Sequence, residues 1–230
     1  MKEVFIFLAG LVSCFAGQAQ GNFLQDATPL HRAEKALTDV IIHDIFSPPV
    51  SSRIYLYANM AAYEVLAKSD PEHYASLHGQ VKTFPLIPST NKKISSSLAA
   101  VCAFTEVGKK LVFSEPMLDD SLKNILAWYK TKKIDRSVYD ASLKYGLQVA
   151  DTILSWANKD HYQETRKLPR YRFLKKEGKW IPTPPAYMAA IEPYWNRIRL
   201  IALDSVTQYR PPLAIDFSKD TASLFYKQAY

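Results

Sequence analysis

The chain has 230 residues, of which 48% are hydrophobic and 22% are charged. These values are ordinary for a soluble globular protein, so they exclude a disordered chain, a coiled coil and a collagen-like protein. With 7 glycines against 14 prolines, the chain has few residues suited to turns of positive φ. This disfavours hairpin-rich β-sandwiches and glycine-loop nucleotide folds. Two cysteines cannot staple a domain of this size, so its stability has to come from packing.

The formal net charge of +7 is mostly local. Residues 159–179 contain eight Lys or Arg and three Asp or Glu, a net charge of +5 that leaves +2 for the rest of the chain. No zinc-finger spacing, aromatic RNA-binding motif or heptad repeat accompanies this patch. We therefore expect a solvated connector there and no nucleic-acid partner.

Residues 1–19 predict an export signal. Lys2 precedes an apolar run over residues 4–16, and Gly17 and Ala19 are the small residues of a signal-peptidase site. The run is too short for a span of about 20 apolar residues, and no later segment is long enough either. Residues 11–14, LVSC, are also similar to a bacterial lipobox, which would attach a lipid to Cys14. We favour cleavage because the apolar run continues past Cys14; the expected location is periplasmic or secreted, or lipid-anchored to a membrane.

Residues 20–165 predict a helical bundle, since apolar residues recur at spacings of three and four in five successive segments. Prolines at 48, 49 and 71 end the first two segments. Ser114 and Asp135 are expected to cap the fourth and fifth helices. The expected inner stripes are Leu30, Ala33, Leu37, Val40, Ile41 and Ile45; Ile54, Tyr57, Ala58, Ala61, Val65 and Leu66; Leu98, Val101, Cys102, Thr105 and Val112; Leu118, Leu122, Ile125, Leu126 and Tyr129; and Val138, Ala141, Tyr145, Val149, Ile153 and Trp156.

The pattern changes over residues 166–215. Tyr171 and Phe173 alternate with arginines, a turn follows at 176–178, and Trp180 lies beyond it, which predicts a short β-hairpin with a basic face. Proline-rich chain then connects to residues 216–230, where Ser218 is expected to cap the start of a last helix. The expected fold is all-α: a bundle of about five to seven helices with one short β-hairpin and a proline-rich wrapping segment.

Few residues suggest chemistry. The five histidines lack metal-site spacing, and no nucleophile-elbow, P-loop or dinucleotide-binding motif occurs. His43 and Asp44 lie at the end of a predicted helix. Glu34 lies earlier on the same helix, and Glu64 lies on the next one. These residues could form a catalytic pair, but such groups more often tie a helix end to its neighbour. Cys102, in an alanine-rich helix, is expected to be a buried thiol rather than a nucleophile.

Two regions carry a family resemblance. Residues 43–55, HDIFSPPVSSRIY, and 59–64, NMAAYE, resemble the start of bacterial vanadium-dependent haloperoxidase-like proteins of the phosphatidic acid phosphatase type 2 superfamily. Residues 178–187, 192–195, 203–205 and 209–212 are similar to the linker between the helical halves of those proteins. The resemblance implies a mainly helical fold and, in a full-length member, bound vanadate.

The resemblance also says which motifs to look for. Members hold vanadate or phosphate with K-x6-R-P, P-S-G-H and S-R-x3-H-x3-D, whose basic side chains neutralise the oxyanion while one histidine ligates the metal or attacks phosphorus. Arg210-Pro211 is the one Arg-Pro pair, and Leu203 stands where the lysine belongs. No Ser-Gly-His occurs, and no histidine has an arginine four residues before it. We therefore expect no catalytic, cofactor-binding or metal residue and no cofactor in this chain.

The sequence thus predicts the amino-terminal helical half of an exported haloperoxidase-like or acid phosphatase-like enzyme, inactive alone. Its expected partner is the carboxy-terminal catalytic half, and a homodimer is a further possibility. The alternative is an exported binding or partner module without catalysis. In that case Tyr187, Tyr194 and Trp195 would line an open cleft rather than pack inward.

Overall fold

The computed structural model describes residues 26–229 and forms two compact units that divide after Ala157. The predicted signal peptide, its cleavage site after Ala19 and the alternative lipid anchor at Cys14 lie outside the described residues. We describe each unit by itself.

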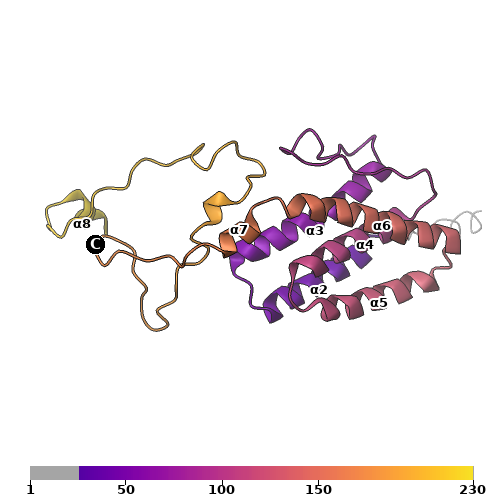
Figure 1. Cartoon of the computed structure of the whole chain (residues 1–230), viewed down its shortest axis with the longest axis horizontal. Coiled ribbons are helices and arrows are strands. Elements are labelled where there is room, and N and C mark those ends of the chain that lie inside the picture. Colours follow the sequence, from indigo (N-terminus) through magenta and orange to yellow (C-terminus); the bar gives the residue numbers. More distant parts are fainter. Residues whose placement is uncertain (1–25, 230) are drawn as a thin grey trace, which may run out of the picture. The chain divides into compact units, whose positions relative to one another are not determined.

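The first unit is a bundle of five helices (Figure 1). The helices are α2 (Thr28–His43), α3 (Pro48–Ser69), α4 (Ser96–Leu111), α5 (Glu115–Thr131) and α6 (Arg136–Ala157). Within residues 26–229 no sheet forms, and the one isolated bridge joins His78 and Val81. The prediction of an all-α fold is therefore confirmed.

Helix α4 is the centre of this bundle, because it packs against α2, α3, α5 and α6. Its sequence is rich in alanine and other small residues, which allows neighbouring backbones to come close, and its buried residues lie on every side. Gly146 of α6 lies where the backbones of α4 and α6 come close. A Cβ atom on Gly146 would lie 2.6 Å from the carbonyl oxygen of Ala99 and 2.8 Å from Cβ of Cys102. The α4–α6 contact therefore requires glycine at this position.

The loop between α3 and α4 closes one side of the core. Phe84 and Ile87 are buried, and the Phe84 ring meets Trp156 edge-on with centroids 5.0 Å apart. Tyr57 meets the same indole at 5.5 Å. This aromatic cluster joins α3, the loop and α6.

Helix α2 ends without the glycine that usually ends such a helix. Ile45 adopts φ +55°, its N–H donates to the carbonyl of Ile42, and the N–H of Phe46 donates to that of Ile41. This pattern is the Schellman motif, whose left-handed position favours glycine. Ile45 was expected in the core stripe, but this turn carries its side chain outward and leaves it 88% exposed.

Of the predicted caps, Ser114 is confirmed in position only and Ser218 is wrong. Ser114 does occupy the N-cap position of α5, but its hydroxyl accepts no backbone N–H of that helix and donates to Asp44. The last helix, α8 (Leu224–Ala229), begins six residues after Ser218, and Ser223 accepts the bond from the N–H of Tyr226. Helix α6 does begin directly after Asp135, as expected.

The second unit contains α7 (Tyr162–Arg166), the short 3-10 helix η2 (Trp195–Arg197) and α8, joined by irregular chain. An ion pair between Arg166 and Glu192 and a hydrogen bond from the Tyr194 hydroxyl to the Pro169 carbonyl hold separate segments together. Over residues 158–229 the buried side chains are Asp160 and Thr165, and every apolar side chain is at least partly exposed. This unit therefore has no hydrophobic core of its own.

The predicted β-hairpin is absent from residues 166–181. Gly178 makes the expected turn at φ +72°, but the backbone bonds of Lys176 and Lys179 stay within that turn. Across it, the rings of Phe173 and Trp180 meet at 6.2 Å. An isolated two-stranded hairpin is at best marginally stable, and Trp180 remains 51% exposed, so no buried face supports a ladder.

Within residues 26–229, no helix is both long and apolar enough to cross a membrane.

Candidate functional site

The helix-end group predicted from sequence does form a polar cluster. Asp44, directly after α2, accepts hydrogen bonds from the backbone N–H groups of Phe113 and Ser114 at 2.8 and 3.0 Å. The Ser114 hydroxyl donates to the other carboxylate oxygen at 2.5 Å. His43 Nδ1 lies 3.1 Å from that oxygen and 3.3 Å from the Ser114 hydroxyl. The cluster ties the end of α2 to the start of α5.

The three side chains are those of a serine hydrolase, but their arrangement is not. A relay needs the carboxylate at one imidazole nitrogen and the serine at the other, so that the imidazole takes the serine proton. Here Asp44 and Ser114 both approach Nδ1 of His43, and the serine proton is bonded directly to the carboxylate. The geometry supports anchoring of a helix end and no nucleophilic step.

The electrostatics agree with an anchoring role. Burial alone would raise the pKa of Asp44, but hydrogen bonds from Ser114, His43 and the Phe113 N–H favour the charged form and lower the pKa to about 2. The Asp44 side chain is 4% exposed. Asp44 is thus a permanently charged carboxylate at neutral pH, unsuited to general acid–base catalysis.

The two glutamates expected near His43 serve other contacts. Glu64 is fully buried in α3 and accepts hydrogen bonds from the Ser76 hydroxyl at 2.8 Å and the Leu77 N–H at 2.6 Å. These bonds anchor the α3–α4 loop to the bundle. Glu34 is half-buried, and its backbone carbonyl accepts the Thr38 hydroxyl. Glu64 is therefore a loop anchor rather than a partner of His43.

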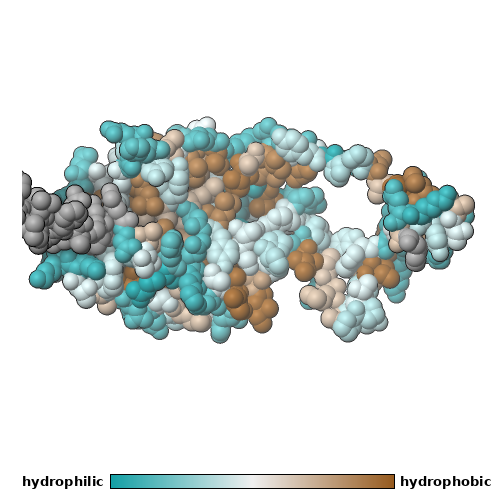
Figure 2. All heavy atoms as spheres, turned by 180° about the vertical axis from the view of Figure 1, so that it is seen from behind, coloured by the Kyte–Doolittle hydropathy of each residue, from teal (hydrophilic) through white to brown (hydrophobic). Residues whose placement is uncertain are grey.

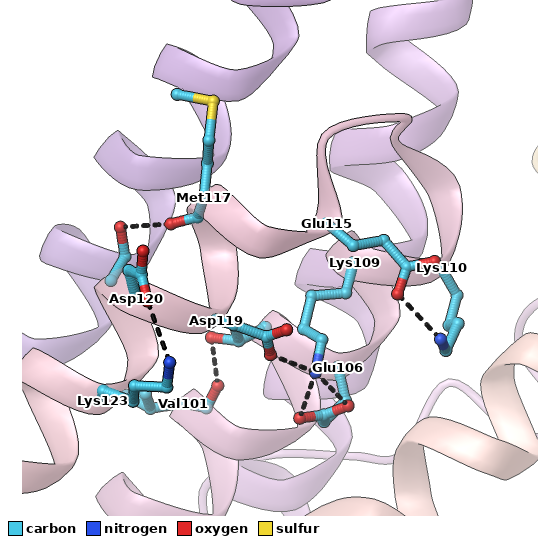
Figure 3. Close-up of polar contacts among 11 residues, drawn as sticks. Val101, Glu106, Lys109, Lys110, Glu115, Met117, Asp119, Asp120 and Lys123 are labelled. Carbon is cyan, nitrogen blue, oxygen red and sulfur yellow. Dashed lines mark hydrogen bonds and ion pairs between the residues drawn. The ribbon is translucent and has the colours of Figure 1, made fainter.

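A further polar cluster, not predicted from sequence, joins α4 to α5 (Figure 3). The ammonium of Lys109 lies 2.6 Å from Asp119 and 3.2 Å from Glu106, and its side chain is 13% exposed. Burial lowers the pKa of Lys109, but the bonds to both carboxylates outweigh burial and raise it. The i,i+3 spacing of Glu106 and Lys109 is visible in the sequence. The third member comes from another helix and could not be predicted.

The histidines are spread over the molecule. His73 contacts Asp70 at 2.8 Å, Nδ1 of His78 lies 2.9 Å from the carbonyl oxygen of Phe84, and His161 lies 3.9 Å from Glu164. Within residues 26–229, no three His, Cys, Asp or Glu side chains are grouped to hold a metal ion.

To bind vanadate as the haloperoxidase motifs do, cationic side chains and a histidine have to lie together around one pocket. Each histidine with a described polar contact pairs with a different neighbour, and Arg166 and Lys109 are already bonded to carboxylates. The carboxylates paired with Arg166 and Lys109 therefore compete with any oxyanion for these two cations.

The aromatic residues proposed to cup a ligand do not share one cleft. A groove of about 550 Å³ in the second unit is lined by Trp180 and by residues 182–186 and 188–191. Tyr187 is 63% exposed, while Tyr194 and Trp195 are half-buried and do not line the groove. The aromatic residue that lines this groove is Trp180, which the sequence placed in the predicted hairpin.

Taken together, the fold and these clusters define an all-α helical domain whose polar groups hold helices together. No family model and no curated protein matches the chain. Among solved structures, it is similar to the "first bacterial vanadium dependant iodoperoxidase", with 42% sequence identity and a TM-score of 0.82. The match covers 87% of this chain, which spans about half of that protein, 48% of its length. The predicted resemblance to bacterial vanadium-dependent haloperoxidase-like proteins is confirmed.

Proposed function

We propose that this chain is a helical domain of an exported vanadium-dependent haloperoxidase-like enzyme, and that a carboxy-terminal part outside it supplies the oxyanion pocket. The observation that carries this proposal is the match at 42% identity over only 48% of the iodoperoxidase. The three oxyanion-binding motifs of the family are missing from the sequence. The domain would contribute packing, and chemistry would require the other part.

In the complete protein we expect peroxide-dependent halide oxidation at bound vanadate. Hydrolysis of a phosphate monoester is the related possibility, because vanadate and phosphate are tetrahedral oxyanions that one pocket of basic side chains can hold. The iodoperoxidase relative favours the peroxidase chemistry.

The experiment is a chimera in which this chain replaces the matched part of the bacterial iodoperoxidase. We expect vanadate-dependent oxidation of iodide by peroxide from the chimera and none from the chain alone. Turnover by the chain alone would contradict the proposal. A folded but inactive chimera would favour the second candidate, a partner module without catalysis, for which the coreless second unit is the supporting observation.

Export is tested separately by expressing the full chain in a bacterium and determining the amino terminus of the processed protein. Cleavage after Ala19 is the expected result. A lipid-modified Cys14 at the amino terminus would instead establish the anchored form, and an intact Met1 in the cytoplasm would contradict export.

A further inference from the structure

The outward face of α3 differs from the outward faces of its neighbours. Helices α2, α5 and α6 all expose charged side chains, among them Lys35, Asp120 and Asp151. Helix α3 exposes none along its 22 residues. Its charged residues Arg53 and Glu64 are buried, and Lys68 is half-buried. Its exposed residues, here called the α3 stripe, are Pro48, Ser52, Asn59, Tyr63, Leu66 and Ser69. Leu66 was expected in the inner stripe, and this expectation is wrong because the side chain is 37% exposed.

The stripe is one continuous surface. Its members recur at spacings of three, four and seven residues, which places them on one side of a helix. The helix is about 33 Å long at 1.5 Å per residue. Half-buried Tyr55 and Leu56 fill the gap between Ser52 and Asn59. A surface helix normally carries charged and polar residues on its solvent face, whereas the solvent face of α3 carries polar residues but no charged one.

A shallow groove of about 550 Å³ lies along the stripe. Its polar groups already have internal partners: the Tyr55 hydroxyl donates to Thr38 at 2.8 Å and the Tyr63 hydroxyl donates to the Ala75 carbonyl at 2.8 Å. The groove therefore offers ring faces, Leu56 and Met60, together with the exposed amide of Asn59, whose NH2 group also donates to the Tyr55 carbonyl. Tyrosine and methionine without charge are typical of the core of a protein–protein interface, whereas a small polar ligand needs convergent donors.

Apolar residues are visible as brown patches on the first unit in the rear view (Figure 2). Teal, hydrophilic residues separate most of these patches, as is usual for a protein surface. The α3 stripe is distinguished by its lack of charge over the whole length of a helix rather than by apolar area alone.

We infer that the α3 stripe is the docking surface for the part of the haloperoxidase-like protein that lies outside this chain. This inference rests on the proposed function. The iodoperoxidase carries about as much chain again outside the match, which is enough to cover a 22-residue helix. The occupant is expected to present an uncharged, largely apolar helix face, because a charged one would lose its hydration without gaining a partner.

Cysteine labelling tests whether the stripe becomes covered. Asn59→Cys on α3 and Gln148→Cys on α6 are matched probes, since both positions are exposed on 22-residue helices. Each is placed in a chain carrying Cys14→Ser. The native Cys102 is 3% exposed and reports folding, because it should react with a maleimide only when the domain unfolds. Labelling rates are measured in the isolated chain and in the iodoperoxidase chimera.

We expect the thiol at position 59 to react quickly in the isolated chain and at least tenfold more slowly in the chimera, while the thiol at 148 reacts alike in both. Equal rates at 59 in both proteins, with Cys102 unreactive, would overturn the inference. Slow labelling at 59 in the isolated chain would also overturn it, because the second unit or a second copy would already cover the stripe. These readouts need no activity, so an inactive chimera counts against the proposed function alone.

If the chimera fails to fold, the inference is tested with variants of the isolated chain. Ser52→Glu with Asn59→Glu places two charges seven residues apart on the stripe, and Gln148→Glu with Ser155→Glu does the same on α6. We expect both pairs to shift the thermal midpoint of the isolated chain equally little. A clearly larger loss for the α3 pair would show that the stripe is packed within this chain and would overturn the inference.

Discussion

The carboxylate of Asp44 lies 2.5 Å from the hydroxyl oxygen of Ser114, 70 residues away in the sequence. This bond and two backbone N–H donors make Asp44 the anchor of the α2 end on the start of α5. Ser114 lies at the N-cap position of α5, but its side chain makes no capping bond there and its hydroxyl donates to Asp44.

Asp44→Asn should destabilise the domain at pH 6 by about 1.5–3 kcal/mol, the usual contribution of a hydrogen bond to a charged group. The pKa of Asp44 is lowered from 3.8 to about 2 in the folded protein. The stability gained from this shift is present above pH 4 and is lost as the pH falls from about 4 to 2. Urea unfolding of both proteins between pH 6 and 2 measures it.

The matched control is Asp39→Asn, which removes the exposed Lys35–Asp39 pair and should cost less than about 0.5 kcal/mol. A difference between wild type and Asp44→Asn that stayed constant down to pH 2 would contradict the account of Asp44.

Ile45→Gly should stabilise the protein by about 1 kcal/mol, since a residue with a Cβ is strained in the left-handed region and glycine is not. Ile45 is 88% exposed at φ +55°, so little packing is lost.

Ile42→Gly is the control: Ile42 is also exposed, at 69%, but lies within α2. There glycine should cost about 0.5–1 kcal/mol. Thermal unfolding compares the variants, and destabilisation by Ile45→Gly would show that the isoleucine side chain contributes more than its exposure implies.

Gly146→Ala should destabilise the bundle by about 1–3 kcal/mol through overpacking, since the new methyl group meets the backbone of Ala99. Gly108→Ala on α4 is the matched change. Its methyl group would meet the end of the Leu37 side chain at 3.1 Å, which can move. Chemical denaturation should therefore find Gly108→Ala nearly neutral. Equal effects of the two substitutions would argue against a backbone clash between α4 and α6.

Burial raises the pKa of Tyr129 to about 12 even though its hydrogen bond with Ser97 lowers it. The Ser97 hydroxyl also donates to the Asp26 carbonyl, so the Tyr129 hydroxyl is the donor in the 2.6 Å bond between them. The folded state keeps the phenol protonated above pH 10, where the unfolded state loses its proton.

The free energy of unfolding should therefore fall as the pH rises from 10 to 12, by up to about 1.4 kcal/mol per pH unit from Tyr129. Tyr129→Phe should remove this contribution. Unfolding curves measured across this range compare the two proteins, and parallel pH dependence would show that Tyr129 does not titrate between folded and unfolded states.

Much of the helical bundle could be predicted from apolar spacing, because each stripe in α2 to α6 follows a period that only one element type satisfies. The end of α2 could not be predicted, because the left-handed position that ends it is occupied by Ile45. A glycine there would have indicated the helix end in the sequence. The hairpin prediction followed alternation around Tyr171 and Phe173, but no buried face supports strands there. The role of Asp44 could be predicted as anchoring, whereas its partner Ser114 and the Lys109–Asp119 pair depend on tertiary contacts between helices.

The measurement that tests the central claim most directly is calorimetric titration of the isolated chain with vanadate, repeated with inorganic phosphate. The account predicts no saturable binding of either oxyanion, because the family's three oxyanion-binding motifs are missing from the sequence. Stoichiometric, saturable binding of vanadate by the chain alone would contradict it.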